Sequence, residues 1–255
     1  MITMYPILTR LIVAVFCLAF LSCHDDDDAS DSTLVKEVAN RDYTDYFTYD
    51  DAGRVTRYRL GDNEDFYTTL EYDGDRLVSL HEYNKQNVVK RVEITYDDTG
   101  RRVADANYRV SDTGAETLLN TQTYVYDNAG NVILKQTADV NGRVVDEEQY
   151  DWEGGNVITN RRYDMRGGRT LRITFQYTYD DRHNPANQSL AFVYIWFFEE
   201  ELSRNNIISE RAIKDGALLW SGTTKIIYNK HGYPTQSVST DDVSAGQPAQ
   251  LNFRY

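Results

Sequence analysis

Histidines, cysteines and paired carboxylates are the residues of this 255-residue chain that could do chemistry. The four histidines, His24, His81, His183 and His231, are scattered and form no HExxH pair for a zinc ion. The sequence contains no Gly-x-Ser-x-Gly elbow, no phosphate-binding loop and no dinucleotide fingerprint. Among 40 acidic residues some pair will lie at glycosidase distance by chance, so such a pair carries no weight. The sequence therefore predicts a protein that is not an enzyme and uses no metal or cofactor.

The N-terminus is typical of a secretory signal, and its chemistry would fall on one thiol. Arg10 precedes an uncharged run, residues 11–21, which is shorter than the roughly 20 residues of a membrane-spanning helix. The sequence Phe20-Leu21-Ser22-Cys23 resembles a bacterial lipobox, although that pattern prefers an aliphatic residue where Phe20 stands. We expect residues 1–22 to be removed and the Cys23 thiol to carry a lipid. The alternative is ordinary cleavage near Ser22, with Cys23 incidental.

An acidic run follows the lipidated cysteine: Asp25, Asp26, Asp27 and Asp28. Such a run resembles the export signal that carries some Gram-negative lipoproteins to the cell surface, so we expect surface display on the outer membrane. The alternative is a solvated acidic tether that like charges keep extended. Residues 29–40 are polar and predict a linker. The predicted organisation is a signal peptide (1–22), a lipidated tether (23–40) and one domain (41–255).

Cysteine usage and net charge limit the partners. Cys17 leaves with the signal and Cys23 carries the lipid, so the mature domain is expected to lack disulfides. Loss of Arg10 with the signal changes the net charge from −13 to −14. This negative net charge argues against binding of nucleic acid and against adhesion of the protein surface to anionic lipid. The membrane is therefore expected as a partner only through the anchor on Cys23.

A tyrosine–aspartate turn recurs along the predicted domain. Tyr49-Asp50-Asp51-Ala52-Gly53 recurs as Tyr96-Asp97-Asp98-Thr99-Gly100 and as Tyr126-Asp127-Asn128-Ala129-Gly130. The Asp side chain can accept bonds from backbone N–H groups two residues on, and Gly supplies the positive φ that closes the turn. Tyr suits a half-buried strand end. Each copy predicts a hairpin tip, and looser copies begin at Tyr72, Tyr150, Tyr163, Tyr179 and Tyr228.

Between these copies, apolar and polar residues alternate as in strands with one wet face. Second turns at 112–114, 140–142 and 214–216 separate the strands. Residues 41–255 therefore predict roughly 12 to 16 strands in an all-β, antiparallel up-and-down meander, curled or closed into a barrel. In two strands the predicted apolar faces are Val92, Ile94 and Tyr96, and Leu171, Ile173, Phe175, Tyr177 and Tyr179.

One segment interrupts the repeats. Residues 190–198 are continuously apolar, follow Asn184-Pro185 and show no alternation. Continuous apolar runs are usually buried, so the favoured interpretation is a plug at one end of the sheet; the alternative is an aromatic binding lip. Trp152 and Trp220 are interpreted in the same way, as packing residues rather than as a platform for sugars.

The tyrosine–aspartate copies resemble the YD repeats of RHS-type proteins. Together with the signal, lipobox and acidic tether, they resemble a bacterial lipoprotein family of unknown function with a porin-like fold. The resemblance covers nearly the whole chain and implies a curled or closed β-barrel without family catalytic residues. A membrane-spanning barrel is the alternative, because residues 251–255 alternate toward a terminal aromatic residue. Residues 143–150 disfavour it, since both of their faces carry acidic side chains.

These patterns favour a non-enzymatic surface lipoprotein that binds an extracellular ligand, either a glycan or a protein. Enrichment in tyrosine suits both ligands. A structural or envelope-assembly lipoprotein that encloses or guides another chain is the second hypothesis, and a hydrolase that uses unpatterned carboxylates is the third. The sequence leaves the ligand-binding residues unknown.

Overall fold

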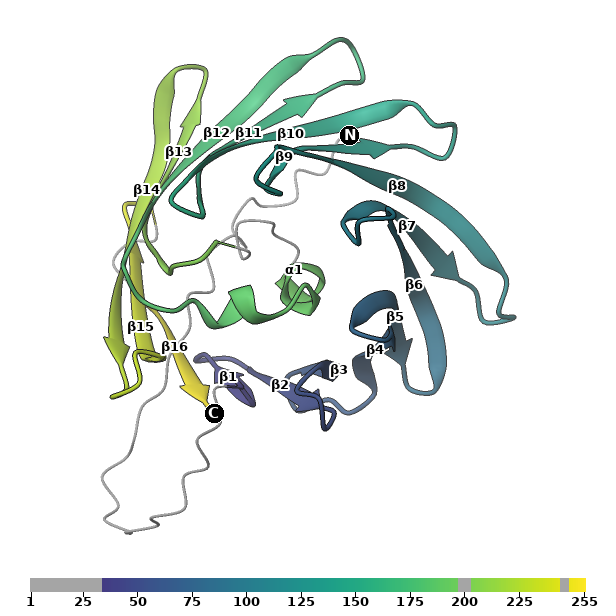
Figure 1. Cartoon of the computed structure of the whole chain (residues 1–255), viewed down its shortest axis with the longest axis horizontal. Coiled ribbons are helices and arrows are strands. Elements are labelled where there is room, and N and C mark those ends of the chain that lie inside the picture. Colours follow the sequence, from purple (N-terminus) through teal and green to yellow (C-terminus); the bar gives the residue numbers. More distant parts are fainter. Residues whose placement is uncertain (1–33, 197–202, 244–247) are drawn as a thin grey trace.

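The chain forms a closed antiparallel β-barrel in a computed structural model that describes residues 34–196, 203–243 and 248–255 (Figure 1). The sixteen strands within these residues follow one another around the barrel, and β1 pairs with β16 to close it. The predicted all-β meander is confirmed. The strands are β1 (Glu37–Ala39), β2 (Thr44–Tyr49), β3 (Val55–Leu60), β4 (Phe66–Asp73), β5 (Arg76–Asn84), β6 (Asn87–Tyr96), β7 (Arg102–Val110), β8 (Glu116–Tyr126), β9 (Val132–Ala138), β10 (Val144–Glu153), β11 (Asn156–Asp164), β12 (Thr170–Tyr179), β13 (Ile207–Lys214), β14 (Ala217–Tyr228), β15 (Pro234–Asp241) and β16 (Ala249–Arg254).

The start of the domain differs from the prediction. Part of the expected linker, residues 29–40, is the strand β1, which pairs with β2 on one edge and β16 on the other. Val35 and Val38 are buried in the core, so this segment belongs to the barrel. A strand of three residues is too short to show alternation, which is why the sequence pattern missed it. The predicted signal peptide, Cys23 and the run from Asp25 to Asp28 lie outside the described residues.

Burial separates the two faces of the barrel wall. Leu70, Leu80 and Val92 are paired across β4, β5 and β6, and they pack in one buried cluster with residues of the helix α1 (Ala191–Trp196). Their face therefore lines the lumen. The alternate residues make the outer face, on which one row of paired residues crosses five strands: Arg57, Thr69, His81, Arg91 and Tyr108.

Strand β12 shows where the predicted alternation fails. Phe175 and Tyr177 are buried in the lumen face as predicted. The register shifts opposite Arg162 and Tyr163 in β11, and Leu171 is left 46% exposed. An extra residue at a bulge moves the following side chains to the other face, and the sequence pattern does not mark it.

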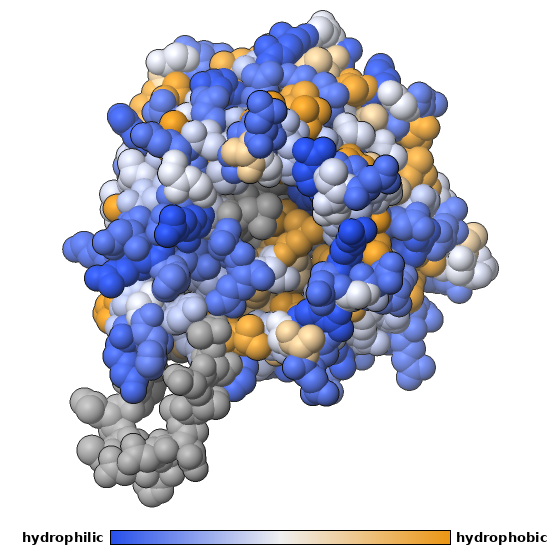
Figure 2. All heavy atoms as spheres, in the orientation of Figure 1, coloured by the Kyte–Doolittle hydropathy of each residue, from blue (hydrophilic) through white to orange (hydrophobic). Residues whose placement is uncertain are grey.

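Charged side chains are spread over the outer face. Arg57 lies over the ring of Tyr67 at 3.9 Å, and this ring stacks on Tyr83 at 4.6 Å. Figure 2 looks onto one end of the barrel, which is predominantly hydrophilic, with hydrophobic residues in the central opening and scattered around the rim. Other charged residues whose strand register places them on this face are Arg59, Glu71, Glu93, Arg161, Arg211 and Lys225.

The tyrosine–aspartate turns have the predicted geometry. Between β6 and β7, Asp97 Oδ1 accepts hydrogen bonds from the backbone N–H groups of Thr99 and Arg101, both at 2.9 Å. Gly100 has a φ of 84°, which would strain any residue with a side chain. Hydrogen bonds from Thr99 and Arg101 hold the pKa of Asp97 well below its usual range. The same pair of backbone bonds occurs at Asp50, Asp127, Asp139 and Asn229.

A ladder of aromatic side chains links neighbouring tyrosine–aspartate turns at one end of the barrel; the Tyr228 hydroxyl, before the turn at Asn229, donates to Asp180 instead. The Tyr96 hydroxyl donates to the Leu77 carbonyl at 2.8 Å, and the Tyr126 hydroxyl donates to the Arg102 carbonyl at 2.6 Å. Both acceptors lie at the start of the strand that follows the preceding turn. The other members of this aromatic ladder are Tyr49 on Val35, Tyr72 on Val55, Trp152 on Val132 and Tyr179 on Val157.

Three looser copies depart from the predicted pattern. Tyr179 ends β12 without a hairpin tip, because the chain continues into the connection that holds the helices before β13. The tip between β10 and β11 is the short turn at Gly154, so Trp152 precedes it as Tyr72 precedes the turn at Gly74, and Trp152 rather than Tyr150 is the member of the aromatic ladder. Tyr163 does not lie at the same barrel end as the other copies, because it precedes the turn at the far end of β11. Its ring packs against Arg169, whose guanidinium carbon lies 3.6 Å from the ring centre.

Candidate functional site: the plugged lumen

The connection between β12 and β13 fills part of the lumen. It contains the short helix η1 (Pro185–Gln188) and α1, which lie inside the ring of strands in Figure 1. Asn184 starts η1, because its side chain accepts a hydrogen bond from the Ala186 N–H at 2.9 Å. Ala191 and Phe192 are buried, and the Phe192 ring lies 5.4 Å from that of Phe47 in β2. For the described part of the apolar segment, the predicted buried plug is confirmed and the aromatic lip is wrong.

A buried polar cluster fastens this plug to the wall. The hydroxyls of Tyr194 in α1 and Tyr124 in β8 each donate to a different carboxylate oxygen of Asp105, both at 2.7 Å. The Arg102 guanidinium lies 3.7 Å from Asp105 and 3.7 Å from the centre of the Tyr124 ring. The side chains of Arg102 and Asp105 are 3% and 1% exposed, so each charge depends on the other and on these hydroxyls. Burial raises the pKa of Tyr194 well above its usual value, so this hydroxyl remains a donor.

A second polar cluster lies on the lumen wall where β9, β10 and β11 meet. Glu148 accepts a hydrogen bond from Asn160 at 3.2 Å and lies 2.8 Å from the Arg162 Nε. The Lys135 ammonium group lies 3.5 Å from the other Glu148 oxygen. The lumen away from the plug therefore combines charges of both signs with apolar side chains, unlike the continuous core around α1.

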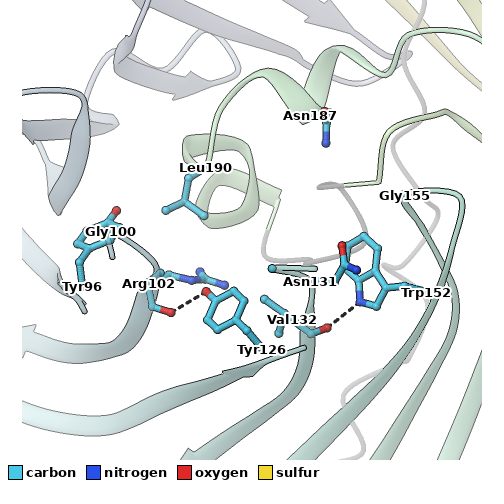
Figure 3. A pocket seen from close by; sticks show the side chains of 11 residues that line it. Tyr96, Gly100, Arg102, Tyr126, Asn131, Val132, Trp152, Gly155, Asn187 and Leu190 are labelled. Carbon is cyan, nitrogen blue, oxygen red and sulfur yellow. Dashed lines mark hydrogen bonds between the residues drawn. The ribbon is translucent and has the colours of Figure 1, made fainter. Parts of the chain in front are cut away.

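A cavity of about 410 Å³ lies between the plug and the hairpin tips of the wall (Figure 3). Three aromatic-ladder residues, Tyr96, Tyr126 and Trp152, line it from the wall. Leu190 and Asn187 line it from the plug, and both side chains point toward the wall in Figure 3. This volume is within the range of about 300–1,000 Å³ that is usual for small-molecule sites. The cavity is thus large enough to hold a small ligand.

The histidines do not form a site. His81 lies on the outer face with its Nδ1 3.6 Å from Glu71, and the His183 ring stacks on Tyr233 at 5.4 Å. Among the described residues, no three His, Cys, Asp or Glu side chains gather as metal ligands would. The predicted lipidation site at Cys23 and export signal at Asp25, Asp26, Asp27 and Asp28 remain predictions, because they lie outside those residues. No helix of the described part is long and apolar enough to cross a membrane.

The sequence did not reveal the residues that hold the plug. Strict alternation would place Arg102 and Asp105 on opposite faces of β7, and the register shift opposite Thr95 and Tyr96 turns both inward. Their partner Tyr194 is 89 residues away from Asp105 in the sequence. The residues around the cavity likewise come from turns and from the plug, which only the closed barrel brings together.

The comparisons with known proteins concern the fold. No family model matches the chain, and no curated protein matches its sequence. The barrel is similar to a porin-like protein from Bacteroides uniformis, with a TM-score of 0.56 and 14% identity over 86% of this chain and 94% of that one. A porin-like protein from Bacteroides vulgatus has a TM-score of 0.56 and 12% identity, over 87% of this chain and 98% of that one. The chain therefore has a porin-like β-barrel fold, as the resemblance implied.

Proposed function

We propose that this chain is a non-enzymatic lipoprotein of the outer membrane, displayed at the cell surface, whose barrel binds an extracellular ligand. The observation that carries the proposal is a barrel with a charged outer face and a lumen occupied by its own chain. Such a barrel is suited neither to contact with lipid tails nor to conduction. It offers a binding cavity on a rigid scaffold, which must be held at the membrane by other means.

The outer face argues for a barrel outside the lipid bilayer. Arg57 and Arg91 lie in one row that crosses the wall, with Glu71 and Glu93 beside it on the same face. A basic side chain that faces lipid costs about 2–4 kcal/mol at the bilayer midplane. Several such residues would make a membrane-spanning position strongly unfavourable, whereas a lipid on Cys23 would anchor a barrel that stands in water.

The occupied lumen argues for binding rather than for passage or enclosure. Phe192 packs on the wall, and Tyr194 is bonded to the buried Asp105, so the plug is part of the folded core. An envelope-assembly role in which the barrel encloses another chain would require this segment to leave. The cavity beside the plug needs no such rearrangement to take a small ligand.

Display can be tested by adding proteinase to intact cells. We expect the native protein to be cleaved, and a variant with Asp25→Ala, Asp26→Ala, Asp27→Ala and Asp28→Ala to be anchored but protected. Cys23→Ala should lose incorporation of a labelled fatty acid and leave the membrane fraction. Protection of both the native protein and the aspartate variant would contradict surface display.

Binding and the absence of catalysis need separate measurements. Purified protein would be applied to a glycan array, and cells that display it would be cross-linked to identify bound surface proteins. A reproducible glycan or protein ligand that is recovered unchanged is the expected result. Turnover of a polysaccharide, abolished by one Asp or Glu substitution, would instead show a hydrolase.

A further inference from the structure

The aromatic ladder carries a second regular contact, between an arginine and an aromatic ring. The residue after the turn glycine reaches forward to the next aromatic ring of the ladder. Arg54 lies over Tyr72 at 4.9 Å, and Arg101 lies over Tyr126 at 5.4 Å. The shorter turn at Gly74 places Arg76 over Tyr96 at 5.8 Å in the same way. A guanidinium on a ring face excludes other molecules from that face.

Trp152 is the ladder member at the cavity where this contact is lost. The position that holds Arg54 and Arg101 in other turns holds Asn131, which follows Gly130. Asn131 and Trp152 both line the cavity (Figure 3). The indole N–H donates to the Val132 carbonyl at 2.7 Å, so the ring is held in one orientation. Asn131 is shorter than the arginines that lie over the other rings. Trp152 packs against the buried cluster around Tyr150 and Val157, as the sequence predicted, and it also lines the cavity.

We propose that the cavity beside Trp152 binds a neutral sugar residue of a glycan, stacked on the indole ring. This inference rests on the proposed binding function and names its ligand. A sugar ring has an apolar C–H face and a rim of hydroxyls, so it needs an aromatic surface and uncharged polar groups beside it. Trp152 supplies the aromatic surface, and Asn131 and Asn187 lie in the lining with amide side chains.

The charges around the cavity select an uncharged ligand. Arg102 is the charged residue of the lining, and its side chain is buried against Asp105. The described residues of the lining include no carboxylate, so among them neither an anionic nor a cationic ligand would meet an unpaired counter-ion. Gly100, Gly130 and Gly155 lie at the hairpin tips of the lining and leave backbone rather than bulky side chains at its edge.

The decisive variant is Asn131→Arg, which introduces the residue that follows the glycine in the turns at Gly53 and Gly100. We expect this variant to fold, because an arginine can make the turn bond that Asn131 makes. Asn131 Nδ2 donates to Asp127 Oδ2 at 2.9 Å, and Arg101 Nε makes the equivalent bond to Asp97 at 2.9 Å. Ala52→Arg adds the same charge at an exposed position in the turn between β2 and β3, outside the cavity lining, and serves as the matched control. Leu190→Trp fills the cavity from the plug side and provides an independent second block.

The experiment measures binding of neutral oligosaccharides of glucose, mannose, galactose, xylose and N-acetylglucosamine by calorimetry, with sialyllactose as the charged comparison. We expect the native protein and Ala52→Arg to bind at least one neutral sugar equally. Asn131→Arg and Leu190→Trp should weaken that binding at least tenfold with unchanged melting temperatures. A sugar bound equally by the native protein and both blocking variants would overturn the cavity assignment but leave the proposed function standing. Absence of any neutral sugar ligand would overturn the ligand class, while the cross-linking experiment still decides the proposed function.

Discussion

Tyrosine hydroxyls hold the polar side chains that point into this barrel. Tyr124 and Tyr194 share the carboxylate of Asp105, and the Tyr58 hydroxyl donates to Asp45 at 3.0 Å. A hydroxyl satisfies one lone pair of a carboxylate without adding a charge. Asp105 also has Arg102 beside it, whereas Tyr58 is the group that lowers the cost of charging Asp45. The two buried carboxylates are therefore expected to respond differently to pH.

Asp45 should make the barrel less stable as pH rises. Burial raises the pKa of Asp45 from 3.8 to about 7, with the Tyr58 bond opposing that rise. Between these pH values the folded protein keeps a proton that the unfolded chain releases, so the free energy of unfolding falls as pH increases from about 4 to about 7. Asp45→Asn should remove this slope and stabilise the protein at pH 8, by up to about 4 kcal/mol. Urea unfolding at pH 5 and pH 8 measures the difference, with exposed Asp98→Asn as the control. An Asp45→Asn variant that tracks the native protein at both pH values would contradict this assignment.

At the level of the hairpin, the turns could be predicted from the sequence more reliably than the buried face of each strand. An Asp followed by a Gly three residues later sets the turn by contacts within five residues, so the tips at Asp50, Asp97 and Asp127 were read correctly. The face of a strand that is buried changes at each bulge. Leu171 was predicted to be buried, but one extra residue in β12 leaves it exposed. Trp152 rather than Tyr150 belongs to the ladder because the turn between β10 and β11 is short and begins after Glu153.

Loss of one hydroxyl of the aromatic ladder should have a measurable cost. Tyr126→Phe leaves the Arg102 carbonyl without its 2.6 Å donor in a partly buried site, which should destabilise the barrel by about 1–3 kcal/mol. Tyr83→Phe removes a hydroxyl from the stacked pair on the outer face and should cost much less. Chemical denaturation of the two variants gives the comparison. Equal losses would mean that the Tyr126 bond contributes nothing specific.

The plug should loosen when its bond to the wall is removed. Tyr194→Phe deletes the 2.7 Å bond to Asp105 but keeps the ring, so residues 185–196 should exchange amide hydrogens faster while β7 and β8 stay protected. Tyr124→Phe removes the other bond to the same carboxylate from the wall side. We expect that variant to affect the wall rather than the plug alone. Unchanged exchange of residues 185–196 in Tyr194→Phe would show that apolar packing holds the plug unaided.

At the scale of the whole molecule, closure of the barrel was the feature that the sequence left open. Glu37 and Arg254 lie opposite each other in β1 and β16, with an oxygen–nitrogen distance of 3.3 Å, although 217 residues separate them. No local pattern reports a pairing between chain ends, and β1 has only three residues. The cluster of Arg102, Asp105 and Tyr194 was hidden for the same reason, since its members meet only inside a closed ring.

Removal of β1 should open the barrel. A chain that begins at Arg41 would leave β2 and β16 with unpaired edges, and exposed edges promote association between chains. We expect such a chain to elute as oligomers in size-exclusion chromatography, and a chain that begins at Leu34 to elute as the full barrel does. A monomeric and equally stable truncated chain would show that closure by β1 is dispensable.

The backward direction of the aromatic-ladder bonds has a consequence for how such barrels change in evolution. Tyr96 and Tyr126 each donate to a carbonyl of the strand after the preceding turn. A unit of two strands therefore contains both the aromatic donor to the unit before it and the carbonyl acceptor for the unit after it. In-frame duplication or loss of one unit would renew the same contact at the new junction and leave the others intact. The circumference can therefore grow or shrink by two strands at a time, and the plug then selects the circumference that it fills.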